Sequence, residues 1–261
     1  PDIPGLGEGT ITSRTFEATR AVVRVAAERP DVRGSRVALI GASTGAGLAI
    51  LAAGRPELAD RISVVAAVAP FADLRKLICL TTTSAYEERD GFSRFEVTDL
   101  HRQVITRSLV AALPDESDRT VLLAELERVE REERNPLDEL ARDRSDVTLK
   151  TRAVLDLLGN RDPDRFRALY SALPPAVLDF VEELSPLEVQ MHPRAPVEIV
   201  VPPNDVYFPL GEARALEAVL PNARLTITGT LDHTRPSASL DKLKDLRSFD
   251  GFVMRGLRAA G

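Results

Sequence analysis

Short apolar runs separated by helical segments constrain the fold of this chain more than any other feature of its sequence. The runs cover residues 36–40, 62–69, 196–201 and 224–228. The second and third do not alternate apolar with polar residues, which is typical of strands buried on both faces. Apolar residues recur at helical spacing in residues 15–28, 48–53, 212–220 and near 241–257. Because strands and helices alternate, the sequence predicts an α/β fold with a mostly parallel sheet flanked by helices.

The long segment between the second and third runs has a different character. It is dense in Arg, Asp and Glu, its apolar residues recur at helical spacing, and no strand-like run interrupts it. Pro114 or Pro136 is expected to separate helices there. We therefore expect a core formed by residues 1–73 and 187–261, and a mainly helical cap insertion at residues 74–186 that lies over the strand ends.

Charge and composition exclude several classes of function. The net charge is −6 and Lys and Arg form no clustered face, so nucleic acid is not an expected partner. The single cysteine, Cys79, excludes an internal disulfide framework and a thiolate metal cluster. No apolar stretch approaches the roughly 20 residues that a membrane span needs. We therefore expect a soluble protein, with the cytoplasm favoured.

The main chemical motif of the chain is Gly41-Ala42-Ser43-Thr44-Gly45. It lies between a predicted strand and a predicted helix and fits the G-x-S-x-G pattern of a nucleophile elbow, in which small residues let the helix pack closely on the strand. The Ser43 hydroxyl would stand exposed at the strand end. The Thr44 N–H, at the start of the helix, could stabilise an oxyanion.

A nucleophilic serine needs a general base, and the chain has 3 histidines. His101 lies in the insertion and His192 precedes a proline just before a strand, so both are expected to be surface or packing residues. His233 lies in a loop shortly after the last predicted strand. Because the carboxyl ends of parallel strands meet at one edge of the sheet, a base on that loop can reach a serine at another strand end.

The base in turn needs an acid that holds its tautomer. Asp205 follows the third apolar run, although an Asn-Asp pair at that place is also ordinary turn chemistry. Asp73 follows the second run and is a rival candidate. Asp232 adjoins His233 and is poorly placed to accept from its neighbour's ring. Asp73 is therefore the more serious rival, and the spacing alone leaves the choice between Asp205 and Asp73 open.

The same turn also has the glycine spacing of short-chain dehydrogenases, with Gly41, Gly45 and Gly47 after a strand. In that family the turn would hold the phosphates of a dinucleotide. The family pairs this turn with a tyrosine followed four residues later by a lysine. The residues at that spacing after the tyrosines of this chain are Asp90, Pro174 and Gly211. The tyrosines therefore do not support this alternative.

Taken together, these features resemble the C-terminal part of an α/β-hydrolase. The elbow, the segment Asp205-Val206-Tyr207-Phe208-Pro209 and His233 occur in that family's order of serine, acid and histidine. The resemblance implies a serine esterase or lipase that acts without metal or cofactor on a small-molecule acyl substrate, with Ser43 as nucleophile, His233 as base and Asp205 as acid. A non-catalytic, hydrolase-like binding scaffold is the alternative.

The opening residues Pro1 to Gly7 resemble the loop that follows the fourth strand of such enzymes. The strand at residues 36–40 would then lack its usual neighbour and present an unpaired apolar edge, which is an aggregation hazard. We therefore expect the sequence to be a fragment of a longer chain, or to need its missing N-terminal segment as a partner.

The resemblance does not identify the substrate. Esters, thioesters, amides and lactones would all suit such a triad. The cap would shape the acyl pocket, for which Phe71, Phe92 and Tyr207 are candidate lining residues. The sequence leaves the second oxyanion donor and the oligomeric state open.

Overall fold

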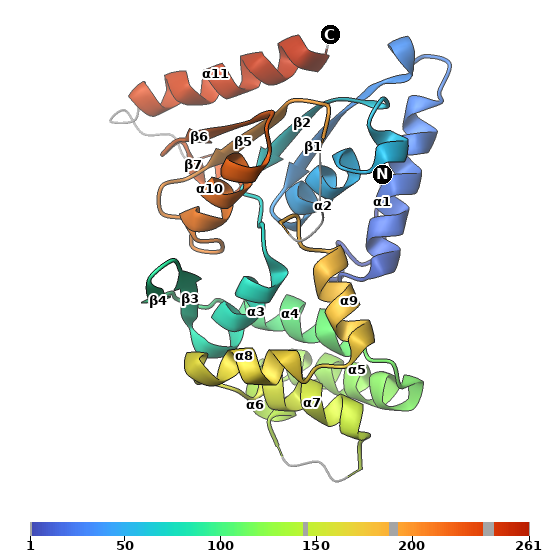
Figure 1. The fold of residues 1–261 in the computed structure, drawn as a ribbon, viewed down its shortest axis with the longest axis vertical. Coiled ribbons are helices and arrows are strands. Elements are labelled where there is room, and N and C mark those ends of the chain that lie inside the picture. Colours follow the sequence, from blue (N-terminus) through green and yellow to red (C-terminus); the bar gives the residue numbers. More distant parts are fainter. Residues whose placement is uncertain (1, 143–145, 188–192, 237–242, 261) are drawn as a thin grey trace. The chain divides into compact units, whose positions relative to one another are not determined.

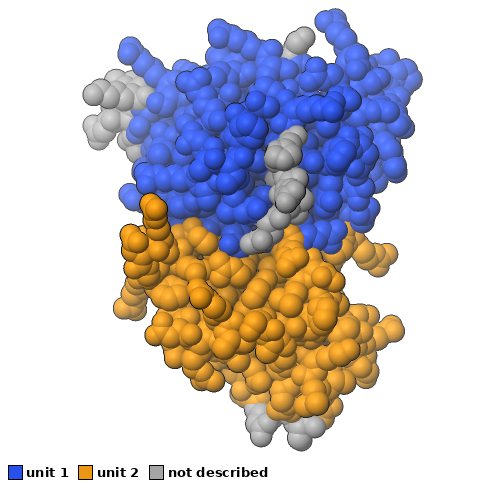
Figure 2. Space-filling model, in the orientation of Figure 1, with its two compact units in different colours: residues 1, 15–73, 183–261 blue, residues 2–14, 74–182 orange. Residues whose placement is uncertain are grey.

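The computed structural model describes residues 2–142, 146–187, 193–236 and 243–260. The chain divides into two compact units (Figure 2), one containing residues 15–73 and 183–261 and the other containing residues 2–14 and 74–182. Residues 2–14, which we expected in the core, group with the inserted segment instead. The Ile11 N–H donates to the Ser108 hydroxyl at 2.9 Å, a contact between residues 97 positions apart in sequence. That the second unit acts as a cap stays a prediction.

The first unit contains a four-stranded parallel sheet (Figure 1). Its strands are β1 (Val37–Ala42), β2 (Ile62–Val68), β5 (Val197–Val201) and β6 (Ala223–Ile227), in the order β1-β2-β5-β6. The central strands β2 and β5 are buried along nearly their whole length, as the absence of alternation predicts. With helices on both faces, the predicted α/β class is confirmed.

The helices of this unit cover the two faces of the sheet. They are α1 (Ser13–Ala27), α2 (Thr44–Ala53), α10 (Leu210–Val219) and α11 (Leu243–Ala260). Helix α2 packs on β1 and β2 and α10 on β5 and β6, whereas α11 lies across β2, β5 and β6 on the other face (Figure 1). Phe252 of α11 is buried against Val200 of β5.

The two edge strands of the sheet differ in character. β1 lies at one edge, as the sequence predicts, and carries only apolar residues and a glycine; Ile40, in its middle, is 80% exposed. β6 lies at the other edge and presents Arg224 to solvent. A charged side chain on an edge strand opposes pairing with other chains. Only the β6 edge has this protection.

The second unit is mainly helical, as predicted. Its helices are α3 (Leu74–Thr83), α4 (Asp99–Ala111), α5 (Glu116–Arg131), α6 (Pro136–Leu140), α7 (Leu149–Leu158), α8 (Pro163–Ser171) and α9 (Pro175–Glu183), the last ending in the first unit. Pro114 lies between α4 and α5, and Pro136 is the first residue of α6. No helix in the described ranges is both long and apolar enough to cross a membrane.

The expectation that no strand interrupts the insertion was wrong. An antiparallel hairpin joins β3 (Ala85–Glu88) to β4 (Gly91–Arg94). Each strand has only 4 residues, too few to show a clear apolar run. A local signal was nonetheless present: the turn residues Arg89 and Asp90 are followed directly by Gly91, which begins β4 and has φ 140°.

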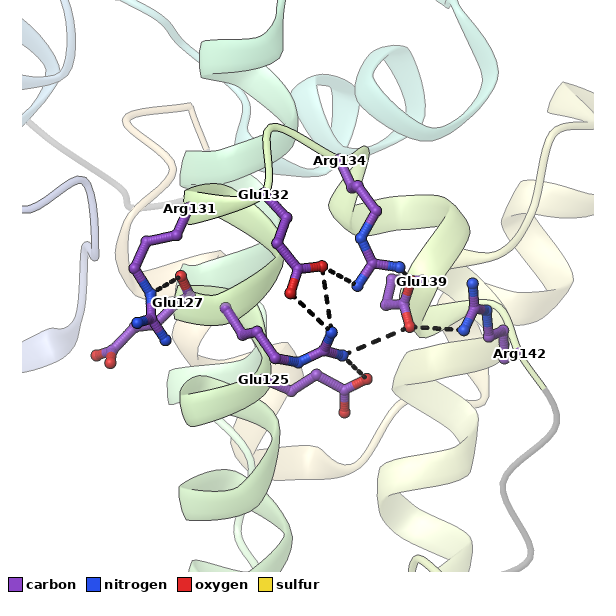
Figure 3. A network of polar contacts seen from close by, with 8 residues as sticks. Glu125, Glu127, Arg131, Glu132, Arg134, Glu139 and Arg142 are labelled. Atoms are coloured by element: carbon purple, nitrogen blue, oxygen red, sulfur yellow. Dashed lines mark hydrogen bonds and ion pairs between the residues drawn. The ribbon is translucent and has the colours of Figure 1, made fainter.

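The Glu139 carboxylate, near the end of the short helix α6, pairs with several arginines of the second unit (Figure 3). The Glu139 side chain is 5% exposed, and its oxygens lie 2.5 Å from Arg134 Nη1 and 2.9 Å from Arg142 Nη1. Arg128 Nη2, on α5, is 3.8 Å away. The network therefore joins the end of α5 to α6.

The inserted segment leaves and rejoins the sheet at neighbouring points. The Leu187 N–H donates to the carbonyl oxygen of Ala72 at 3.0 Å. The two ends of the insertion are thus hydrogen-bonded to each other within the first unit.

Candidate active site

Ser43 forms a strained turn between β1 and α2. Its backbone has φ 53° and ψ −124°, a region that non-glycine residues avoid and that is kept only where the surroundings enforce it. The Ser43 N–H donates to the Val68 carbonyl oxygen at 2.8 Å, which continues the β1–β2 ladder. The side chain is partly exposed. This is the geometry expected of a nucleophile elbow.

Small residues beside Ser43 make the turn possible. A Cβ atom on Gly41 would lie 2.4 Å from the Gly45 carbonyl oxygen, closer than packed atoms come. The first turn of α2 therefore rests directly on the end of β1. Thr44 is the first residue of α2, and its N–H has no carbonyl oxygen one turn earlier in the helix to bind. That position suits an oxyanion donor.

Asp205 and His233 are in direct contact. The Nδ1 atom of His233 lies 2.8 Å from Oδ2 and 3.0 Å from Oδ1 of Asp205. The Asp205 side chain is 2% exposed and that of His233 is 11% exposed. A hydrogen bond between a carboxylate and an imidazole is stronger away from water than at the surface. The carboxylate therefore fixes one nitrogen of the ring and leaves the other, Nε2, for chemistry.

The loop after β5 holds the carboxylate of Asp205 in place. Its Oδ1 accepts the N–H groups of Tyr207 at 2.7 Å and Phe208 at 3.2 Å. This is the turn chemistry that the sequence left as an alternative, and here it accompanies the contact with His233. Of the two rival acids, Asp232 is exposed to solvent. Asp73 is buried, and its backbone N–H donates to the Glu212 carboxylate.

His233 lies in a tight turn between the two-residue strands β7 (Leu231–Asp232) and β8 (Arg235–Pro236). Its φ of 52° belongs to the left-handed region. The ring packs against Tyr207, with centroids 4.4 Å apart, and edge-on against Phe208 at 5.6 Å. Aromatic packing and the Asp205 carboxylate together leave the ring little freedom.

Strand register places the three expected triad residues at one edge of the sheet. Ala42 pairs with Val68, Val68 with Val200, and Val201 with Ile227. Ser43 follows the first strand of this row, Asp205 the third, and His233 the last. The structure thus joins Asp205 to His233. Within the described part of the chain, no hydrogen bond connects Ser43 to His233.

The remaining candidate residues have other roles or lie elsewhere. His101 is buried and caps α4, with its Nδ1 2.9 Å from the Thr98 hydroxyl. His192 lies outside the described residues. Phe71 packs edge-on against Phe208, at 6.0 Å between centroids, whereas Phe92 is 45% exposed on β4 of the other unit. Among the described residues, no three His, Cys, Asp or Glu side chains are grouped as metal ligands.

Sequence reasoning missed Glu212, which is 1% exposed and accepts two backbone N–H groups of the loop after β2. Its partners, Ala72 and Asp73, are 140 and 139 positions away in the chain. An acidic residue in the first turn of a helix is common for local reasons alone, so the sequence carried no signal of this contact.

Comparison with known proteins supports the predicted resemblance. Residues 11–110 match the model of the acetyl xylan esterase family (AXE1), which is fewer than half of the residues but includes the turn at Ser43. No curated protein matches the sequence significantly. The chain therefore resembles esterases along this segment, as the α/β-hydrolase pattern predicts.

Several solved structures are similar to the chain. An alpha/beta fold family hydrolase from Bacillus anthracis str. Sterne is 16% identical with a TM-score of 0.40, covering 94% of this chain and 73% of that one. A serine hydrolase from Cycloclasticus zankles is 14% identical with a TM-score of 0.40, and the match covers 95% of this chain and 73% of that one. A hydrolase from Oleispira antarctica is 13% identical with a TM-score of 0.41, and the match covers 96% of this chain and 72% of that one. Because these TM-scores are low, the fold assignment depends on the parallel sheet itself.

Proposed function

We propose that this protein is a serine hydrolase that cleaves carboxylic esters through Ser43, His233 and Asp205. The observation that carries the proposal is the buried contact of 2.8 Å between Asp205 and His233, on the same sheet edge as the strained turn at Ser43. A nucleophile in such a turn, a base and a buried acid are the parts that acyl transfer requires.

In the first half of the reaction, the Ser43 hydroxyl attacks the ester carbonyl carbon. Its proton passes to Nε2 of His233, while the Nδ1 proton remains hydrogen-bonded to Asp205. The carbonyl oxygen becomes an oxyanion, to which the Thr44 N–H donates. The tetrahedral intermediate then collapses, and the alcohol leaves with the proton from the imidazolium. The products of this half are the alcohol and an acylated Ser43.

In the second half, water takes the place of the alcohol. His233 removes a proton from the water as it attacks the acyl-enzyme, and then returns that proton to Ser43 Oγ. The carboxylic acid leaves and the enzyme is restored. Asp205 stays a carboxylate throughout, because its task is to orient the ring and to stabilise the imidazolium.

The substrate class that we propose is a short-chain ester, with acetyl esters first. Support comes from the match to the acetyl xylan esterase family model, whose matched residues 11–110 include the Ser43 turn. Esters need less help for the leaving group than amides, so a single oxyanion donor and one base are better suited to them.

Labelling with a fluorophosphonate probe tests the proposal directly. We expect wild-type protein to be labelled, and Ser43→Ala and His233→Ala variants to lose the label. Ser35→Ala is a matched control, because Ser35 is exposed and also has a positive φ, 53°. It should be labelled like wild type. Absence of labelling in folded wild-type protein would favour the non-catalytic scaffold.

Hydrolysis of p-nitrophenyl esters then tests the acyl group. We expect the highest kcat/KM with acetate and lower values with butyrate and octanoate. A preference for octanoate would contradict the acetyl proposal while leaving the serine mechanism in place.

A further inference from the structure

Glu212 is the most deeply buried charged side chain near the proposed triad, and the mechanism above does not use it. It is 1% exposed and lies in the first turn of α10. Its Oε2 accepts both the Ala72 N–H at 2.7 Å and the Asp73 N–H at 2.9 Å. Burial of a carboxylate is costly unless hydrogen bonds compensate it. Glu212 therefore fixes the position of the loop after β2.

That loop carries Phe71, which packs between the helix that follows Ser43 and Phe208, a neighbour of His233. Phe71 is 5% exposed, and its ring occupies the space beside Gly47 of α2, where a Cβ would meet Cε1 at 2.5 Å. On its other side the ring packs against Phe208, which packs against His233. Phe71 thus lies between α2, the helix that follows Ser43, and Phe208, whose ring packs against that of His233.

Glu212 is also close in sequence to Phe208, in the segment that follows β5. Its own N–H donates to the Pro209 carbonyl oxygen at 2.9 Å, directly after Phe208. Glu212 therefore contacts the loop that carries Phe71 through its side chain and the loop that carries Asp205 and Phe208 through its main-chain N–H. Without the Glu212 carboxylate, two buried N–H groups would lack this acceptor, and one of the links between the two loops would be lost.

We propose that Glu212 is a positioning residue for the acyl-transfer reaction. Through Phe71 it sets the placement of the His233 ring relative to the Ser43 turn. The inference depends on the proposed function for its kinetic consequence, but the placement of His233 can be measured without any activity.

The test compares Glu212→Met, Glu212→Gln and Glu217→Met. Methionine removes the acceptor, whereas glutamine keeps one oxygen, and Oε2 alone accepts both N–H groups in the structure. Glu217 is the matched control on the same helix: it is exposed, and its Oε1 accepts the Leu225 N–H at 2.9 Å, away from the triad. Urea unfolding of each variant separates loss of stability from loss of positioning.

The kinetic readout is the rate of fluorophosphonate labelling and the values of kcat and KM for p-nitrophenyl acetate. We expect Glu212→Met to lower labelling and kcat by about 10–100-fold with little change in KM, since small displacements of catalytic groups have effects of that size. Glu212→Gln should recover most of the rate, and Glu217→Met should resemble wild type.

The second readout is the imidazole NMR spectrum of ¹⁵N-histidine-labelled protein, with the His233 signals assigned from a His233→Gln variant. Glu212→Met should shift or broaden these signals, and Glu217→Met should not. If wild type is neither labelled nor active, the proposed function fails, yet the spectrum still decides whether Glu212 positions His233. Unchanged His233 signals, or unchanged labelling of an active enzyme, in a folded Glu212→Met variant would overturn the inference.

Discussion

A Cβ atom placed on Gly41 would lie 2.4 Å from the carbonyl oxygen of Gly45. Both positions belong to the turn that presents Ser43, and the atoms in the way are backbone, which cannot move aside as a flexible side chain can. Any residue other than glycine at position 41 must therefore push α2 away from β1.

Gly41→Ala should accordingly destabilise the first unit by about 1–3 kcal/mol and displace Ser43. Urea unfolding would measure the first effect, and the rate of fluorophosphonate labelling the second. Gly256→Ala on α11 is the matched control, because nothing lies within 4 Å of its added Cβ. That variant should be as stable as wild type or slightly more so, since alanine favours helix. Equal stability of the two variants would contradict the prediction.

Asp205→Asn should lower kcat for ester hydrolysis by about 10³–10⁴-fold, because an amide does not hold the same ring tautomer or stabilise the imidazolium. The residue is nearly isosteric, and the Oδ1 bonds to Tyr207 and Phe208 can persist. The measurement is steady-state hydrolysis of p-nitrophenyl acetate. Asp232→Asn removes an exposed carboxylate next to His233 and should have little effect. If Asp232→Asn is the more damaging change, Asp205 is not the acid.

Glu139→Gln should destabilise the second unit by about 1–2 kcal/mol. The carboxylate is 5% exposed and two arginines lie within 3 Å of it, but the side chains of Arg134 and Arg142 are 35% and 64% exposed, so water weakens their attraction. Thermal unfolding followed by circular dichroism measures the loss. Glu127→Gln is the control: that carboxylate is 63% exposed and 3.9 Å from Arg107. It should change stability by less than about 0.5 kcal/mol.

Because of Cys79, on α3 of the second unit, the free energy of unfolding should fall as the pH becomes alkaline. Burial raises the pKa of its thiol in the folded protein. The resulting contribution to the free energy of unfolding is complete below the thiol pKa of the unfolded protein, about 8.5. It is lost as the pH rises through the higher pKa of the folded protein. Between the two values, the free energy of unfolding should fall by up to about 1.4 kcal/mol per pH unit relative to a Cys79→Ala variant.

Urea unfolding of both proteins from pH 7 to pH 10 measures this difference. The variant removes only the thiol, so titration of other groups cancels in the comparison. Parallel pH profiles for the two proteins would show that the folded thiol ionises as easily as the unfolded one.

Much of the fold could be predicted from the sequence because its signals are local. The runs at residues 62–69 and 196–201 are mostly apolar and do not alternate with polar residues, which is the pattern of the buried strands β2 and β5. The glycines around Ser43 likewise describe a turn whose geometry depends on the nearest residues. In both cases the physical cause lies within a few positions of its effect.

The features that could not be predicted depend on contacts between distant residues. Glu212 meets Ala72 across 140 positions, and Ile11 meets Ser108 across 97, so no periodicity or spacing reveals either pair. The choice of Asp205 over Asp73 is similar. Both carboxylates follow buried strands, and only the folded loops decide which of them meets the histidine.

The hydrogen bond between Leu187 and Ala72 has a consequence for how such a protein can evolve. Because Ala72 and Leu187 flank the inserted segment and are hydrogen-bonded to each other, that segment is a closed excursion of the chain that begins and ends at one place. Doubling the length of a flexible loop adds only about 0.6 kcal/mol to its closure cost. A lineage could therefore lengthen or trim the loops between the helices of this segment, and thereby diversify, while the same hydrogen bond kept its two ends together.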